Sequence, residues 1–270
     1  MSELEKLSIG QIIKFKLWFE NYVDDFIKNY PEKKENLELK RIHTHNVCKE
    51  SLKIMQYYRK NNECRLSAYI IALFHDIGRF EQYAFFNTFN DRISKDHAEL
   101  SIKVILENNL LKNINDYTKN IIIKAIENHN KAQLPKCGDY KLNFLSKVIR
   151  DADKIDIYRI VTQNYVSKKP NSIVNLELED RAFISDNVYR SILNKKPVKY
   201  VDLKTIMDLK VLHLSWVFDI NFIYTFERIS RESYLEKIFS TMAQNKQTQI
   251  IFQLVENYVD KKLKLGRNEV

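Results

Sequence analysis

An imidazole and a carboxylate stand side by side at the end of an apolar run in this sequence. The run covers residues 68–74, and His75 and Asp76 follow it directly. Burying such groups without a partner would cost about 2 to 7 kcal/mol for a neutral polar group and more for a charge. A divalent metal ion is the simplest partner, because imidazole nitrogen and carboxylate oxygen form a common mixed ligand set. A buried pair without an ion is the alternative, and a two-residue motif alone favours it.

Further ligand-type side chains stand at the ends or on the apolar faces of other segments. In chain order the candidates are His43 or His45, His75 with Asp76, His97, His129 and Asp151. Each one alone is more simply explained by a hydrogen bond to the backbone, and Asp96 beside His97 fits a helix N-cap. The chain has only six histidines, and the order of these candidates is difficult to explain by packing. We therefore expect them to meet in one metal centre.

The elements that must position these residues are predicted to be helices. Gly and Pro number only four each, far below their usual shares of about 7 and 5 percent. A sandwich or barrel would need more tight turns than these residues supply. Apolar residues recur instead with helical spacing. The predicted helices cover residues 8–29, 34–60, 64–77, 97–111, 116–129, 142–166, 202–227, 230–243 and 248–265.

Two predicted loops adjoin the candidate ligands. Residues 79–96 are aromatic and polar without clean periodicity, and a loop of this length is more often functional than a plain connector. Residues 130–140 contain Pro135 and Gly138. No fixed-period repeat and no Gly/Ser-rich linker is visible. We therefore expect a single all-α domain over residues 1–270, with the motif core at about 40–160 and a C-terminal helical extension at about 200–265.

The net charge indicates an anionic partner. Lys and Arg number 44 against 35 Asp and Glu, which gives a net charge of +9. A positive field favours phosphorylated small molecules, nucleic acid or an acidic membrane surface, although a solvated lysine-rich surface explains it equally well. The densest basic fragments, residues 167–171 and 194–199, lack the interleaved aromatic residues that stack on single-stranded nucleic acid. A small phosphorylated substrate is the favoured partner, and nucleic acid is not.

Cysteine usage and hydropathy indicate where the protein works. The three cysteines, Cys48, Cys64 and Cys137, are irregularly spaced, which fits neither a disulfide framework nor a zinc finger. No stretch reaches 18 apolar residues, and the N-terminus lacks a basic start followed by an apolar region. We expect no membrane association and a reducing, cytoplasmic setting. Whether the protein forms a homo-oligomer stays open.

The ordered set of His43, His75-Asp76 and Asp151 resembles the signature of the HD-domain metal-dependent phosphohydrolases. More narrowly, the phrases ALFHDIGRFEQ, TFNDRISKDHAEL, ENHN and RDADKIDI are similar to those of a bacterial subfamily in which they recur. The resemblance covers roughly residues 40–160. It implies an all-α HD-domain bundle that holds metal between helices, in agreement with the helical periodicity.

The resemblance also implies the ligands. Those of a first ion would be His43, His75, Asp76 and Asp151. His43 precedes Val47 by four residues, which matches the family's spacing, whereas His45 does not. On a helix the two histidines point about 200° apart, so His45 is only the fallback.

His97 and His129 suggest a second ion, with Asp76 as the carboxylate that bridges the two. In a centre with one ion, these histidines would contact phosphate or act as acid and base. The resemblance implies Mn, Fe, Co, Ni, Zn or Mg as the cofactor, in one or two copies. The sequence leaves the number of ions open.

The chemistry implied is hydrolysis of a phosphate ester, because bound metal lowers the pKa of water from about 15.7 toward 7 and neutralises phosphoryl oxygens. Arg79 could grip phosphate with two hydrogen bonds. Lys154, three residues after Asp151, could add a second positive charge on the same helix face. Surface exposure, or an ion pair with Glu81 or Asp156, is an equally good explanation of these two cations.

Several residues near the motif are expected to support it. Those that could orient the histidines are Glu81, Gln82, Asp91 and Asp96. The aromatic residues of 80–89 would form a pocket wall or, somewhat preferred, ordinary core. His213 stays outside the metal set because it lies on a continuous apolar helix, where Trp216 and Asp219 could close the pocket.

The sequence thus favours a divalent-metal-dependent phosphohydrolase, a phosphomonoesterase or phosphodiesterase, that acts on a nucleotide or another small phosphate ester. The continuation typical of cyclic-dinucleotide phosphodiesterases is absent after ENHNKAQLP, and no synthetase-like partner domain accompanies the motif. A non-catalytic metal- or nucleotide-binding regulatory module is the alternative, and nucleic-acid binding through the basic surface is a third hypothesis.

Overall fold

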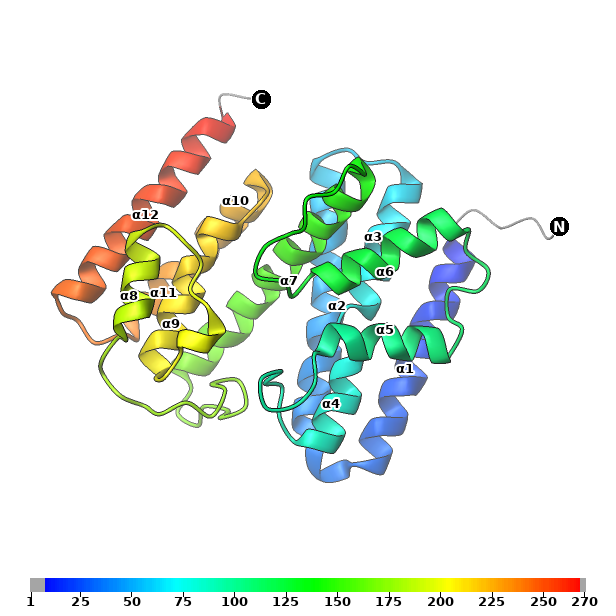
Figure 1. The fold of residues 1–270 in the computed structure, drawn as a ribbon, viewed down its shortest axis with the longest axis horizontal. Helices are drawn as coiled ribbons and strands as arrows, with labels where there is room; N and C mark the ends of the chain where they lie inside the picture. The colour runs from blue at the N-terminus through cyan, green and yellow to red at the C-terminus, as the bar shows by residue number, and fades with distance from the viewer. Residues whose placement is uncertain (1–7, 268–270) are drawn as a thin grey trace. The chain divides into compact units, whose positions relative to one another are not determined.

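The computed structural model describes residues 8–267 (Figure 1). The helices are α1 (Ile9–Asn29), α2 (Lys34–Tyr57), α3 (Asn62–Phe74), α4 (Gly78–Phe86), α5 (His97–Glu107), α6 (Asp116–Asn128), α7 (Tyr140–Val166), α8 (Asp186–Leu193), α9 (Ile206–Ser215), α10 (Ile223–Arg231), α11 (Tyr234–Ser240) and α12 (Lys246–Arg267). The short 3-10 turns are η1 (Pro31–Lys33), η2 (Tyr200–Asp202) and η3 (Trp216–Asp219). Over residues 8–267 no strand forms, and one isolated bridge joins Glu179 to Thr205. The predicted all-α class is confirmed.

The helices differ most from the sequence-based prediction around residues 78–96 and 186–231. The predicted loop 79–96 begins with α4, whose buried residues Phe80, Tyr83 and Ala84 follow helical spacing. The predicted helix 202–227 is divided into α9, η3 and α10, and the short helix α8 precedes it. These helices are short, so each contains too few apolar repeats for hydrophobic periodicity to predict its ends.

Polar side chains begin the helices that carry the candidate ligands. The side chain of Asn61 accepts a hydrogen bond from the backbone N–H of Cys64 and starts α3. Asp96 starts α5, and Asn115 starts α6, in the same way. Such N-caps satisfy backbone donors that a first helical turn leaves unpaired.

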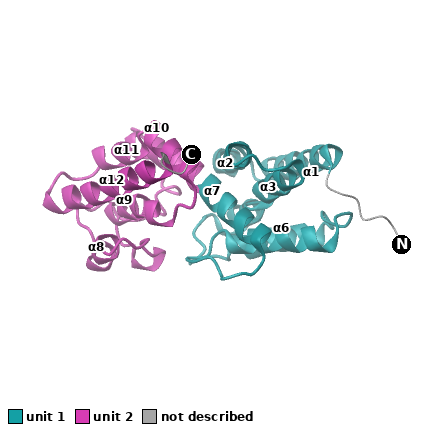
Figure 2. Ribbon diagram, turned by 90° about the horizontal axis from the view of Figure 1, so that it is seen from above, with its two compact units in different colours: residues 1–153 teal, residues 154–270 magenta. Residues whose placement is uncertain are grey.

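The chain divides into two compact units, Met1–Asp153 and Lys154–Val270 (Figure 2). The division falls inside α7. In the first unit α2 packs on α3, α4 packs on α5, and α3 and α5 both contact α6. The single domain expected over residues 1–270 stays a prediction.

Helix α3 lies at the centre of the first unit. Ile70, Ile71, Leu73 and Phe74 have no exposed surface. A helix that is apolar on all sides must be buried in this way. The chain therefore delivers His75 and Asp76, which directly follow α3, into the interior.

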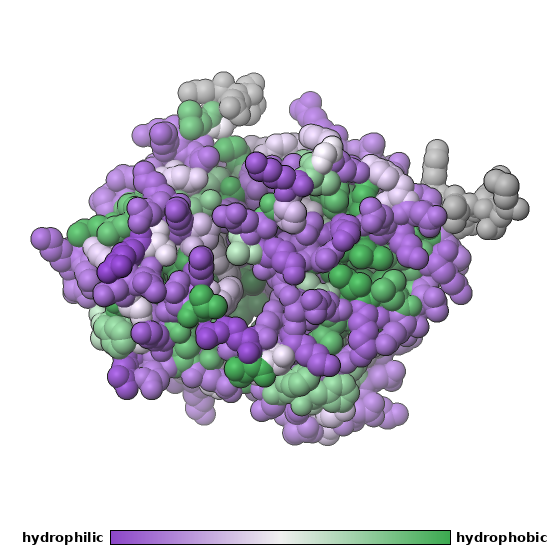
Figure 3. Space-filling model, in the orientation of Figure 1, coloured by the Kyte–Doolittle hydropathy of each residue, from purple (hydrophilic) through white to green (hydrophobic). Residues whose placement is uncertain are grey.

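The second unit has its own core, formed by Tyr158 of α7 together with apolar residues of α8 to α12. The carboxylate of Asp208 organises the entry to α9, because it accepts hydrogen bonds from the backbone of Ser185, Lys204 and Thr205. Hydrophilic side chains cover much of the face in Figure 3, with hydrophobic residues in separate patches. No helix within residues 8–267 combines the length and apolar character needed to cross a bilayer.

Candidate metal centre

Three histidines of the first unit direct the same ring nitrogen into one cluster. His75 Nδ1 lies 2.8 Å from Ala72 O, and His129 Nδ1 lies 2.6 Å from Ile126 O. Because a carbonyl oxygen only accepts, Nδ1 of each ring carries the proton and Nε2 keeps its lone pair. His97 Nδ1 lies 2.5 Å from a carboxylate oxygen of Asp91, which fixes the same tautomer. This is the arrangement of histidines that bind metal through Nε2.

Asp76 lies between two pairs of histidines. Its Oδ2 is 3.5 Å from His43 Nε2 and 3.8 Å from His75 Nε2. Its Oδ1 is 3.5 Å from His97 Nε2 and 3.9 Å from His129 Nε2. Each pair forms with Asp76 a group whose ligand atoms lie within 4.8 Å of one another. One carboxylate thus presents one oxygen to each pair.

The second carboxylate of the cluster is Asp153, whereas the sequence led us to expect Asp151. Asp153 Oδ1 is 3.1 Å from His43 Nε2 and 3.7 Å from His75 Nε2. Both aspartates lie on α7, and side chains two residues apart on a helix point about 200° apart. Asp151 is fully buried on the same helix. We therefore add Asp153 to the candidate ligands, and the expected role of Asp151 as a ligand stays a prediction.

The two candidates for the first ligand have different surroundings. His43 is fully buried and lies in the cluster. His45 lies on another face of α2, where its Nε2 is 2.9 Å from Glu20 Oε1 and its side chain is 28% exposed. The structure thus brings His43, and not the fallback His45, to Asp76.

Arg79 is held by oxygens of the protein itself. Its Nη1 donates to Gln82 Oε1, Phe89 O and Asp91 Oδ1 at 2.7, 2.6 and 2.8 Å. Its Nε lies 3.5 Å from Asp76 Oδ1. A guanidinium held in this way orients the carboxylates of Asp76 and Asp91. The contact with phosphate that we expected of Arg79 stays a prediction.

Lys154 also has a partner, although not one of those considered from the sequence. Its Nζ lies 2.8 Å from Asp219 Oδ2 within the second unit. Glu81 pairs with Lys103, and Asp156 pairs with Arg159. The expected role of Lys154 at a phosphate stays a prediction.

Asp91 and Gln82 support His97, as their position in the sequence suggested. Asp91 Oδ2 contacts His97 Nδ1, while Asp91 Oδ1 accepts a hydrogen bond from Gln82 Nε2 at 2.8 Å. Asp96 caps α5 and accepts a hydrogen bond from Asn130 Nδ2 at 2.8 Å. The loop between α4 and α5 is thereby fixed at its contacts with the cluster.

Sequence reasoning missed Ser101, which holds the turn after α3. Its hydroxyl donates to His75 O at 2.8 Å and accepts from Gly78 N–H at 3.0 Å. A Cβ at Gly78 would stand 2.5 Å from Ser101 N, so only glycine permits this close approach. A serine within a predicted apolar helix gave no signal of this role.

Arg150 was missed for a similar reason. Its Nη1 donates to His129 O at 3.1 Å and also bonds Lys131 O, at the C-terminal end of α6. Cations are favourable at that end of a helix. Arg150 therefore holds the backbone that carries His129.

The aromatic segment 80–89 has two parts. Phe80 is fully buried, with its ring centroid 5.9 Å from that of Phe19, so the expectation of ordinary core holds there. Phe89 lies beside the cluster, where the ammonium of Lys40 is 5.2 Å from its ring centroid. The second part therefore adjoins the candidate ligands.

The cluster combines ionised carboxylates with a neutral imidazole at His129. Burial alone would raise the pKa of Asp76, but Lys40, His75 and Arg79 together hold it well below its usual range. Burial would likewise raise the pKa of Asp153, but the neighbouring His43 and His75 hold it well below its usual range. Burial, with the neighbouring His97, lowers the pKa of His129 to about 3. Metal binding requires these protonation states.

The geometry calls for a cation. The Nε2 atoms of His97 and His129 are 2.9 Å apart, yet the partner of each Nδ1 leaves a lone pair on both. Two lone pairs at this distance repel each other unless a proton or a metal ion lies between them. Nε2 of His75 is buried and makes no hydrogen bond with any residue of 8–267. This nitrogen and oxygen donor set fits a divalent transition metal.

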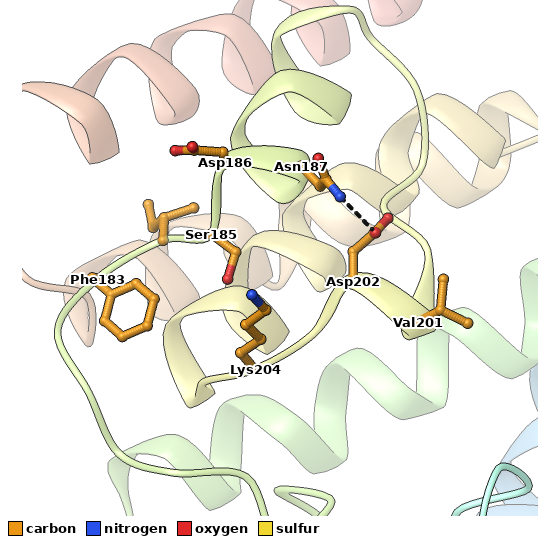
Figure 4. A pocket seen from close by; sticks show the side chains of 8 residues that line it. Phe183, Ser185, Asp186, Asn187, Val201, Asp202 and Lys204 are labelled. Atoms are coloured by element: carbon orange, nitrogen blue, oxygen red, sulfur yellow. Dashed lines mark hydrogen bonds between the residues drawn. The ribbon is translucent and has the colours of Figure 1, made fainter.

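A separate pocket of about 440 Å³ lies in the second unit (Figure 4). It is lined by Phe183, Ile184, Ser185, Asp186, Asn187, Val201, Asp202 and Lys204. Asn187 Nδ2 donates to Asp202 Oδ1 across 3.2 Å. The pocket has no histidine in its lining, so it does not share the chemistry of the cluster.

Comparison with known families adds one match. Residues 41–158 match the family model described as HD domain. The matched stretch contains His43, His75, Asp76, His97, His129 and Asp153. No curated protein and no solved structure matches the chain.

Proposed function

We propose, from the premise that residues 41–158 carry an HD domain, that this protein is a divalent-metal-dependent phosphohydrolase acting on a nucleotide or another small phosphate ester. The observation that carries the proposal is the position of Asp76, whose two oxygens face two separate pairs of histidines. A buried carboxylate so placed can serve two ions. The proposal includes a cytoplasmic setting and leaves the subfamily open.

The donor atoms divide into two sets. In the proposal, the ligands of one ion are His43, His75, Asp76 and Asp153, and those of a second ion are Asp76, His97 and His129. Bound metal would lower the pKa of a water molecule from about 15.7 toward 7 and neutralise phosphoryl oxygens. The transition metals Mn, Fe, Co, Ni and Zn suit the histidine nitrogens better than Mg does.

The residues around these ligands keep the donors in order. Asp91 holds the proton of His97 on Nδ1, and Arg79 holds Asp91. Because burial lowers the pKa of His129 to about 3, its ring is neutral at physiological pH. A neutral ring can bind metal but cannot give a proton to a leaving alcohol. This favours the ligand role over the acid role for His129.

An ion-binding measurement and an activity panel test the proposal together. Metal-free protein should bind Mn, Co, Ni or Zn in titration calorimetry and then hydrolyse at least one member of a panel of nucleotides and generic phosphate esters. The double variant His75→Ala plus Asp76→Ala should lose both properties, with its helical circular dichroism retained. His45→Ala serves as the control, because His45 lies on the same helix as His43 but outside the cluster.

Two outcomes contradict the proposal. Full activity in the double variant would show that the cluster does no chemistry. Ion binding and stabilisation by a nucleotide without any product would identify the non-catalytic binding module instead.

A further inference from the structure

Lys40 occupies one side of Asp76. It lies on α2, one helical turn before His43, and its Nζ donates to Asp76 Oδ2 across 2.7 Å. The side chains of Lys40 and Asp76 are 15% and 4% exposed. The same oxygen faces His43 at 3.5 Å and His75 at 3.8 Å. The ammonium and an ion held by these histidines would therefore compete for one oxygen.

Arg79, the cation on the other side of Asp76, is less free to move than Lys40. Arg79 reaches Oδ1 only through Nε at 3.5 Å, and three further protein oxygens hold its guanidinium in place. Lys40, by contrast, has a single ammonium on a flexible stem. Within residues 8–267, Asp76 is the hydrogen-bond partner of that ammonium. Lys40 can leave Asp76 by rotating its own side chain.

The charge of the cluster explains why a cation is needed there when no metal is bound. Asp76 is a buried carboxylate, and Asp153, whose side chain is 19% exposed, is a second carboxylate that faces the same histidines. Removing the partner of a buried charge is strongly destabilising. Lys40 supplies a positive charge at the oxygen that lies toward His43 and His75.

We propose that Lys40 is an exchangeable counter-ion, which neutralises Asp76 in the metal-free protein and releases Oδ2 when an ion is bound by His43, His75 and Asp153. This inference rests on the proposed metal site. Lys40 then lets the chain fold before it acquires metal, at a cost in ion affinity. Metal binding at this position becomes an exchange of one cation for another.

The variant Lys40→Met tests the inference, because methionine fills similar space without charge. Without metal, we expect its thermal midpoint to fall below that of the wild type by at least about 4 °C. With saturating Mn²⁺ this gap should close. In titration calorimetry its affinity for Mn²⁺ should rise by about tenfold or more, because no ammonium opposes the ion.

The control is Lys103→Met. Lys103 pairs with Glu81 at 3.0 Å in the same unit, but its side chain is 47% exposed. This variant should change neither the metal-free midpoint nor the ion affinity. Should Lys40→Met fail to fold without metal, Lys40→Gln allows the same two measurements, because its amide can still donate to Asp76.

The results separate this inference from the proposed function. A stability gap that persists unchanged with Mn²⁺ would show that Lys40 is only structural, and an affinity that stays level or falls would also overturn the exchange. In both cases wild-type binding of Mn²⁺ would leave the proposed metal site standing. A wild-type protein that binds no divalent ion would overturn the site and the inference together.

Discussion

Two buried histidine sites in this molecule have opposite surroundings. His213 of the second unit is 3% exposed, and its Nδ1 lies 2.8 Å from the hydroxyl of Tyr165. Burial lowers its pKa to about 3, with no contribution from a neighbouring charge. In the first unit, ionised Asp76 and Asp153 face the ring nitrogens of the histidines. A buried histidine therefore indicates a metal site only where several ring nitrogens converge on charged oxygens.

The largest expected effect concerns the carboxylate on α7. Asp153→Asn keeps the size of the side chain but removes the charge that lies 3.1 Å from His43 Nε2. We expect ion affinity and kcat/KM to fall by more than the roughly 10- to 100-fold loss typical of residues that only support a ligand. Asp151→Asn is the matched control and should keep its ion, as calorimetry and elemental analysis can show. The reverse result would restore the assignment made from the sequence.

The register of α7 is the part of the site that sequence could not determine. The phrase RDADKIDI offers three aspartates, Asp151, Asp153 and Asp156, within two helical turns. Which one faces the histidines depends on the rotation of α7 against α2 and α3, and that rotation is set by packing. For His43 and His45 the choice was easier, because the family's spacing to Val47 favoured one residue.

The fold could be predicted from the sequence more fully than the contacts that support the candidate site. Helical periodicity and scarce glycine and proline predicted the all-α class, and the N-cap at Asp96 was visible in the sequence. Lys40, Ser101 and Arg150 were invisible, because each acts on a residue distant in the chain through its place in the packed structure. Lysine, serine and arginine occur too widely on helices for type or spacing to reveal such contacts.

A smaller effect is expected at the carboxylate that orients His97. Asp91→Asn removes the charge 2.5 Å from His97 Nδ1 and weakens the constraint on its tautomer. We expect ion affinity at the His97 and His129 pair to fall by roughly 10- to 100-fold, as measured by titration with Mn²⁺. Asp202→Asn, which alters a hydrogen-bonded carboxylate of the second unit, should leave the affinity for Mn²⁺ unchanged. Equal affinities in the two variants would mean that Asp91 does not tune the site.

The next prediction concerns His213 and the pH dependence of stability. Its pKa falls from about 6.5 in the unfolded chain to about 3 in the folded one. Between these values the unfolded chain binds a proton that the folded chain does not, so stability falls as pH decreases from about 6.5 toward 3. One such group contributes about 1.4 kcal/mol per pH unit.

His213→Phe removes this titration and keeps an aromatic ring. In urea unfolding of metal-free protein between pH 6 and pH 4, the variant should lose about 1.4 kcal/mol less per pH unit than the wild type. Its Mn²⁺ affinity should equal that of the wild type, because His213 contacts Tyr165 rather than a carboxylate. Parallel pH profiles would show that His213 titrates normally, and lost ion binding would remove the contrast between the two sites.

The smallest effect is expected at His45, and it gives the comparison its sharpest control. His45 and His43 are two residues apart on one helix, so their rings point about 200° apart. His45 contacts Glu20 at 2.9 Å from a position 28% exposed, and exposed ion pairs contribute at most about 1 kcal/mol. His45→Ala should therefore lower stability by less than about 1 kcal/mol and leave Mn²⁺ affinity intact, whereas His43→Ala should weaken ion binding strongly. If His45→Ala weakened binding instead, α2 would have to present its other face to Asp76, and the cluster described here would be wrong at its first ligand.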